Sequence, residues 1–315
     1  MVRQRGHSAQ KSPRTFGIKT LKMATAVLVL GAAIAAVGIR ASAAPKMPNS
    51  PSGLLEFDYT PSGSSLNHAE WNTYITSAGA GGTPWNSNGE GGSTAAGYPD
   101  YDAEYDLARQ VSQRGGTIIL RATETPTRGI LNGEPSEFPF ASGVLSTYGK
   151  FEFTGGYVQI TAKMPGAAGM WPGLWMLPGS GAKGVTAANT SEIDIFEGGA
   201  RAPSGSTRAD MYSWHLHTPA GSYGANINSH VNLTTQFNTY GLRWVPGRSI
   251  TWYLNGKFIG SITSARATIP DEPMELLISL QVATAAASYW HSVYNDFVPL
   301  NNQMLISSVK VFSLG

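Results

Sequence analysis

Residues 250–259 read Ile-Thr-Trp-Tyr-Leu-Asn-Gly-Lys-Phe-Ile, two short runs of β-favouring residues on either side of Asn255-Gly256. Asn and Gly tolerate the positive φ angles that a type I′ turn requires, so this dipeptide between apolar runs predicts a β-hairpin. Similar short runs recur along the chain, separated by Gly, Pro, Asn and Ser. The clearest of them predict strands at residues 116–120, 156–164 and 243–245.

The pattern of the whole chain indicates an all-β protein. No long window has helical periodicity, and no internal repeat of fixed length is visible. Many strands around one core favour a two-sheet antiparallel β-sandwich of the jelly-roll, concanavalin-like type with an open substrate cleft. Residues 77–102 and 179–190 lack the strand pattern. We expect them to be long surface loops, which commonly form the walls of binding sites.

The N-terminal 43 residues have the pattern of a secretory signal. Several Lys and Arg residues precede the uncharged apolar run 23–39, and Ala-Ser-Ala at 41–43 suits signal peptidase. An uncleaved N-terminal anchor is the alternative. We therefore expect a signal peptide at 1–43, a Pro/Ser-rich linker at 44–53 and one domain at 54–315, secreted from the cell and not stably bound to the membrane.

Composition limits the classes of function. The chain has no cysteine, which excludes a disulfide framework, so a monomer with a large hydrophobic core is expected. The net charge of +2 includes the basic leader, and no Lys/Arg block suits a phosphate backbone, which argues against nucleic acid. Eight Trp and 13 Tyr in a weakly charged chain suit a polysaccharide partner, although many of them also serve as core residues.

Three acids interrupt the apolar segment Ser-Glu-Ile-Asp-Ile-Phe-Glu at 191–197. Because side chains alternate along a strand, Glu192 and Asp194 share one face, and strict alternation would place Glu197 on the opposite, apolar face. One extra residue, a β-bulge at Ile195 or Phe196, would return Glu197 to the face of the other acids. The sequence therefore predicts a bulge within this strand.

With the bulge, the Cα atoms of Glu192 and Glu197 would lie roughly 13 Å apart, a gap that two glutamate side chains can largely close. Retaining glycosidases hold two carboxyl groups about 5 to 5.5 Å apart, one as nucleophile and one as proton donor. Asp194 between them would help to keep one carboxyl protonated. A metal cluster and a solvated edge strand are the alternatives for these acids.

The segments around these acids resemble glycoside hydrolase family 16, the laminarinase-like endo-β-glucanases, over most of residues 54–312. Met-Trp-Pro-Gly-Leu-Trp-Met-Leu-Pro at 170–178 is similar to the W-P-x-x-W-L-L-P run of that family. Further segments that match in order are residues 142–147, 156–165, 238–244 and 250–256. The resemblance implies the sandwich fold and a secreted polysaccharide hydrolase.

The resemblance also implies roles for individual residues. Glu192 would be the nucleophile, Asp194 its partner and Glu197 the acid/base. The residues expected to contact the substrate are Trp171, Trp175, Trp214, His217 and Trp290, with core packing as the alternative for the Trp pair and a structural role as the alternative for His217.

Some positions depart from the family pattern. Residues 155–161 lack the charged side chains that relatives often carry there, and 279–283 reads Ser-Leu-Gln-Val-Ala in place of Asn-Leu-Ala-Val-Gly. Ser307 stands near the place of an acid that binds structural calcium in several relatives. We therefore expect no catalytic metal and no cofactor, and structural calcium has no clear ligand set.

Three hypotheses about function remain. The first is endo-hydrolysis of β-1,3- or mixed β-1,3/1,4-glucan by double displacement. The second is the same chemistry on agarose, carrageenan or a wall glycan, or transglycosylation. The third is a non-catalytic β-glucan-binding module. A metal hydrolase is disfavoured, because His215 and His217 are two residues apart with no third ligand evident in the sequence.

Overall fold

The computed structural model describes residues 53–84, 101–131, 134–200, 209–294 and 302–315. The predicted signal peptide and almost all of the predicted linker lie outside these ranges. Within them, no helix is long and apolar enough to cross a membrane.

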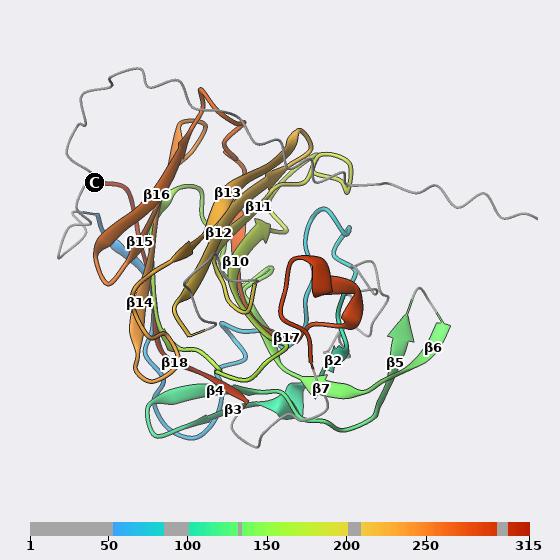
Figure 1. Ribbon diagram of the computed structural model, residues 1–315. Helices are drawn as coiled ribbons and strands as arrows, with labels where there is room; N and C mark the ends of the chain where they lie inside the picture. Colours follow the sequence, from blue (N-terminus) through green and yellow to red (C-terminus); the bar gives the residue numbers. More distant parts are fainter. Residues whose placement is uncertain (1–52, 85–100, 132–133, 201–208, 295–301) are drawn as a thin grey trace, which may run out of the picture. The chain divides into compact units, whose positions relative to one another are not determined.

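Two antiparallel sheets dominate the described chain (Figure 1). The large sheet runs in the order β16 (Lys257–Thr263), β15 (Ser249–Leu254), β14 (Asn238–Val245), β9 (Gly156–Lys163), β18 (Gln303–Phe312), β4 (Thr117–Arg121) and β3 (Val111–Arg114), with β1 (Leu55–Tyr59) also paired to β18. The six-stranded sheet runs in the order β13 (Gly221–Asn228), β12 (Met211–Thr218), β11 (Glu192–Glu197), β10 (Met170–Pro178), β17 (Met274–Val282) and β8 (Val144–Ser146).

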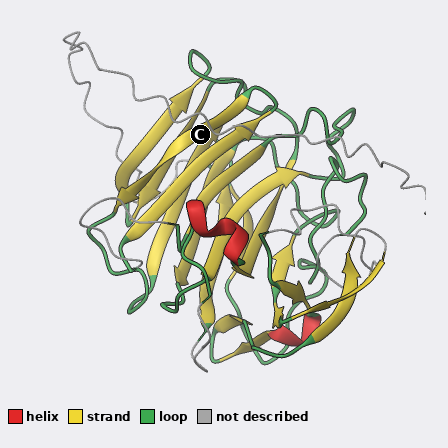
Figure 2. Ribbon diagram, turned by 45° about the vertical axis from the view of Figure 1, so that its right-hand side comes forward, coloured by secondary structure: helices red, strands yellow, loops and turns green. Residues whose placement is uncertain are grey.

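Smaller elements complete the structure, and Figure 2 shows how few of them are helical. They are a parallel pair, β2 (Glu104–Asp106) and β7 (Phe140–Ser142), an antiparallel pair, β5 (Thr127–Leu131) and β6 (Glu134–Phe138), and two 3₁₀ helices, η1 (Ala108–Gln110) and η2 (Ala285–Tyr289). The all-β sandwich predicted from the sequence is confirmed.

The predicted hairpin is formed by β15 and β16. Asn255 and Gly256 have φ angles of 50° and 74°, as a type I′ turn requires. The other three predicted strands correspond to β4, β9 and β14; the bounds of β4 and β9 differ by one residue from the prediction, and β14 begins several residues earlier than expected. Residues 179–190 form a loop, as predicted, whereas most of the loop predicted at 77–102 lies outside the described residues.

The core fills the space between the two sheets. Tyr240, Trp244 and Trp252 of the large sheet are fully buried in one cluster with Ile193 and Leu216 of the six-stranded sheet. The other face of the six-stranded sheet, which we call the acid face, is the one turned away from this core.

The expectation that Trp214 contacts the substrate is wrong. Its side chain is 6% exposed and packs on Trp252, with ring centroids 4.7 Å apart. The reason is strand alternation, because β12 turns Trp214 toward the core and its neighbours His215 and His217 toward the acid face.

Candidate active site

A β-bulge in β11 places all three acids on the acid face. Asp194 pairs with His215 and Glu197 with Ser213, so three steps along β11 match two steps along β12. The pairing with β10 shifts at the same place and leaves Ile195 as the extra residue. Ile195 and Phe196 are consequently both buried in the core, while Glu197 returns to the acid face. The predicted bulge is confirmed.

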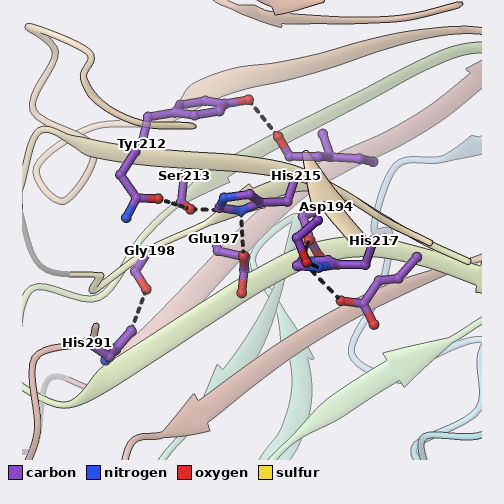
Figure 3. A network of polar contacts seen from close by, with 12 residues as sticks. Asp194, Glu197, Gly198, Tyr212, Ser213, His215, His217 and His291 are labelled. Atoms are coloured by element: carbon purple, nitrogen blue, oxygen red, sulfur yellow. Dashed lines mark hydrogen bonds and ion pairs between the residues drawn. The ribbon is translucent and has the colours of Figure 1, made fainter. Parts of the chain in front are cut away.

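Two side chains from other strands support the bulge. The Tyr212 hydroxyl donates a hydrogen bond of 2.7 Å to the carbonyl oxygen of Ile195, and the Trp252 indole donates one of 2.7 Å to that of Asp194 (Figure 3 shows the Tyr212 bond). Buried carbonyl groups that the sheet ladder does not satisfy need such partners. The irregular backbone that positions Glu197 is therefore held by side chains of β12 and β15.

Replacing Tyr212 with Phe should lower the free energy of unfolding by about 1–3 kcal/mol, because it leaves the Ile195 carbonyl buried without a partner. Denaturant unfolding measures this change. Tyr240→Phe is the matched control, because Tyr240 is equally buried nearby but its hydroxyl has no hydrogen-bond partner among the described residues. Equal destabilisation by both variants would contradict the role given to the Tyr212 hydroxyl.

Asp194 forms an ion pair with His217 beside Glu192. The Nε2 atom of His217 lies 3.1 Å from Asp194 Oδ2 and 4.0 Å from Glu192 Oε1. Burial, together with the charges of the two glutamates, raises the pKa of Asp194 well above its usual range. Burial alone would lower the pKa of His217, but its hydrogen bond to Asp194 and the nearby carboxylates raise it to about 10. A pKa of about 10 keeps His217 protonated at neutral pH.

The two glutamates have different surroundings. The Glu192 side chain is 35% exposed, and its pKa is raised by loss of water, with protonated His217 acting in the opposite direction. Glu197 is 17% exposed, accepts a hydrogen bond of 2.9 Å from Trp171 Nε1 and has His215 Nδ1 at 3.4 Å. Burial alone would raise the pKa of Glu197, but the contact with His215 and the charge of that residue lower it.

His215 is the site residue that sequence reasoning missed. Its Nδ1 atom lies 3.2 Å from Ser213 Oγ, which donates a hydrogen bond of 2.6 Å to Asn226 Oδ1, so a chain of polar groups runs from β13 to Glu197 (Figure 3). The sequence did contain an indication of this role, because the alternation His-Leu-His at 215–217 places both histidines on the same face of β12. The bulge decides which acid each histidine meets, and its register could not be read from the sequence.

Both residues of the tryptophan pair are partly exposed on the acid face, where Trp175 also packs against a cluster of buried apolar residues. Trp171 contacts Glu197, and Trp175 Nε1 donates to Ser279 Oγ at 3.1 Å. Ser279 in turn contacts Gln281 Oε1 at 3.3 Å. Ser279 and Gln281, two positions at which this chain departs from the family pattern, thus fix the orientation of Trp175.

Trp290 and His291 support Trp171 from the segment after η2. The Trp290 ring packs edge-on against Trp171 with centroids 4.7 Å apart. Buried His291 contacts the same ring, and its Nε2 lies 2.9 Å from the carbonyl oxygen of Gly198 (Figure 3). The segment therefore braces both Trp171 and the turn that follows Glu197.

Among the described residues, the acid face is accessible to solvent at Glu192 and His217, whose side chains are 35% and 39% exposed. A face exposed in this way can admit the interior of a long polymer.

The structure also brings together four side chains that could bind a metal ion, a grouping that the sequence did not reveal. Asp194, Glu197, His215 and His217 each offer one ligand atom, and these four atoms lie within 4.8 Å of one another. Ser307, at the expected calcium position, instead donates a hydrogen bond of 3.3 Å to the Thr161 carbonyl oxygen.

Comparison with known proteins identifies related chains. The family model of glycosyl hydrolases family 16 matches residues 97–297. Endo-1,3-1,4-beta-glycanase EglC of Rhizobium meliloti (strain 1021) is 28% identical over 199 residues, and ExsH, of the same name and organism, is 30% identical over 200 residues. Each match covers 62% of this chain and 38% of the relative, so the chain spans less than two fifths of the length of these relatives.

The fold has a counterpart among solved structures. The endo-beta-1,3-glucanase of Pyrococcus furiosus superposes with a TM-score of 0.64 at 24% identity, covering 85% of this chain and 97% of that one.

Proposed function

This chain belongs to glycosyl hydrolases family 16, and we propose that it is a secreted, retaining endo-glycosidase that hydrolyses β-1,3- or mixed β-1,3/1,4-glucan. The observation that carries the proposal is the bulge of β11, which brings Glu192 and Glu197 to one sheet face. The similarity to two endo-1,3-1,4-beta-glycanases supports the choice of polymer.

The reaction would proceed in two displacements. In the first, a Glu192 oxygen attacks the anomeric carbon while Glu197 gives its proton to the departing glycosidic oxygen, leaving a glycosyl ester on Glu192. In the second, Glu197 takes a proton from water, and the resulting hydroxide displaces Glu192 from the sugar. Two inversions give net retention.

Neighbouring groups would prepare each acid for its step. The positive charge of His217 at 4.0 Å stabilises the ionised form of Glu192, as a nucleophile requires. In the substrate-free protein the pKa of Glu197 is lowered, which is opposite to the need of a proton donor. A sugar chain over Glu197 removes water from its carboxylate and so raises its pKa toward the protonated form.

The charge distribution supports an uncharged substrate. None of the six strands that form the acid face contains Lys or Arg, whereas the strands of the large sheet carry Arg114, Arg121, Lys163, Arg243, Lys257 and Lys310. Sulfated polymers such as carrageenan would need compensating positive charge at the site. Trp171 and Trp175 suit the apolar faces of neutral sugar rings.

A polysaccharide panel tests the proposal. We expect release of reducing ends from β-1,3- or mixed-linkage glucan, and less from agarose and carrageenan. Proton NMR of the first products should show the β-anomer, which then mutarotates. Initial formation of the α-anomer would contradict the retaining mechanism, and no release from any polymer would favour a binding module.

A further inference from the structure

We propose that the acid face also contains a zinc-binding site, formed by Asp194, Glu197, His215 and His217, and that zinc bound there blocks the polysaccharide. Inhibition rests on the proposed function, because it needs an activity to inhibit. Binding of zinc does not depend on that function and can be measured alone.

The spacing of the four ligand atoms fits a tetrahedral ion. Zinc–ligand bonds of about 2.0–2.1 Å place neighbouring ligand atoms about 3.3–3.4 Å apart. His215 Nδ1 and Glu197 Oε2 are separated by 3.4 Å, and His217 Nε2 and Asp194 Oδ2 by 3.1 Å. Each of the four residues offers one ligand atom such that all four lie within 4.8 Å of one another, so small side-chain rotations would complete the tetrahedron.

A second layer of contacts orients one of the histidines. His217 Nδ1 lies 2.6 Å from Ser222 Oγ. Donation of the Nδ1 proton to this hydroxyl leaves the Nε2 lone pair directed at Asp194, where the ion would lie. Metal-binding histidines commonly have such a partner on the ring nitrogen that does not bind the metal.

Ligand type and charge select the class of ion. Two imidazoles with two carboxylates favour zinc and similar transition metals over calcium and magnesium, which prefer oxygen ligands. The His217 side chain is 39% exposed, so an ion can reach the site from solvent. The six strands of this sheet carry no Lys or Arg to repel it.

Zinc and the polysaccharide would use the same residues, so we expect that binding of one excludes binding of the other. An ion on Glu197 occupies the carboxylate that has to donate the proton, and an ion on Asp194 lies beside the nucleophile. We therefore expect reversible inhibition rather than a permanently bound metal.

Isothermal titration with zinc chloride tests binding on the intact chain. One zinc should bind with a Kd below roughly 1 mM, and His215→Gln and His217→Gln should each weaken binding at least tenfold, about the loss expected for one ligand. His68→Gln and His230→Asn are controls, because both histidines are exposed and neither belongs to the group of four ligand residues. Circular dichroism confirms folding, and His215→Gln remains informative if His217→Gln does not fold.

Kinetics test the inhibition separately. Zinc should inhibit glucan hydrolysis competitively, EDTA should restore the full rate, and equal concentrations of calcium or magnesium should not inhibit. Unchanged zinc affinity in both histidine variants would overturn the site. Loss of activity in EDTA, or inhibition that substrate does not relieve, would overturn its inhibitory role. Zinc binding without activity on any glucan would instead refute the proposed function alone.

Discussion

Glu192→Gln should lower kcat on β-glucan by at least about 10⁴-fold, because the amide has nearly the shape of the carboxylate but cannot attack the anomeric carbon. The fold should be preserved, since the Glu192 side chain is partly exposed and makes no ion pair closer than 4.0 Å. Initial rates of reducing-end release, measured beside the melting temperature, separate loss of chemistry from loss of structure.

Glu124→Gln is the control for this change. Glu124 is exposed and lies outside the six-stranded sheet, so its variant should keep the full rate.

Azide tests directly whether Glu192 is the nucleophile. In Glu192→Ala, azide can occupy the space of the missing carboxylate and attack an activated β-glucoside, which would yield the α-glycosyl azide. Normal turnover by Glu192→Gln would refute the assignment of the nucleophile.

Glu197→Ala should lower kcat on polysaccharide by about 10²–10⁴-fold, the usual contribution of a general acid–base group. The loss should depend on the leaving group. An aryl glycoside whose phenolate departs without protonation should still form the glycosyl ester with Glu192, so that a burst of phenol precedes slow turnover. Stopped-flow absorbance measures the burst.

Azide distinguishes the two carboxyl groups. In Glu197→Ala it should attack the glycosyl ester and give the β-glycosyl azide, the opposite anomer to that expected from Glu192→Ala. The variant Trp171→Phe is a milder control, because it removes the 2.9 Å hydrogen bond to Glu197 but leaves the carboxyl group. If Glu197→Ala loses equal activity on both substrates and azide gives no β-product, Glu197 is not the acid/base residue.

The need for a bulge could be predicted because it follows from counting residues. Glu192, Asp194 and Glu197 cannot share a face of a regular strand, and an acid among Ile193, Ile195 and Phe196 would be costly to bury. The extra residue could not be assigned from the same count, since Ile195 and Phe196 are both apolar. The register against β10 identifies Ile195.

Trp214 shows the opposite case. The resemblance implies a substrate contact for Trp214, but alternation along β12 turns this side chain to the face opposite His215 and His217. On that face it packs on Trp252, a residue far apart from it in the chain.

Local chemistry was sufficient to predict the all-β class, the hairpin at residues 250–259 and the common face of the three acids of β11. The reason is that turn geometry and side-chain alternation act over a few residues. Tertiary structure alone decided that Tyr212 and Trp252 hold the bulge, that His217 pairs with Asp194 and that His215 meets Glu197. These contacts depend on the register between strands. That register is set by packing of the whole sheet, and no short segment encodes it.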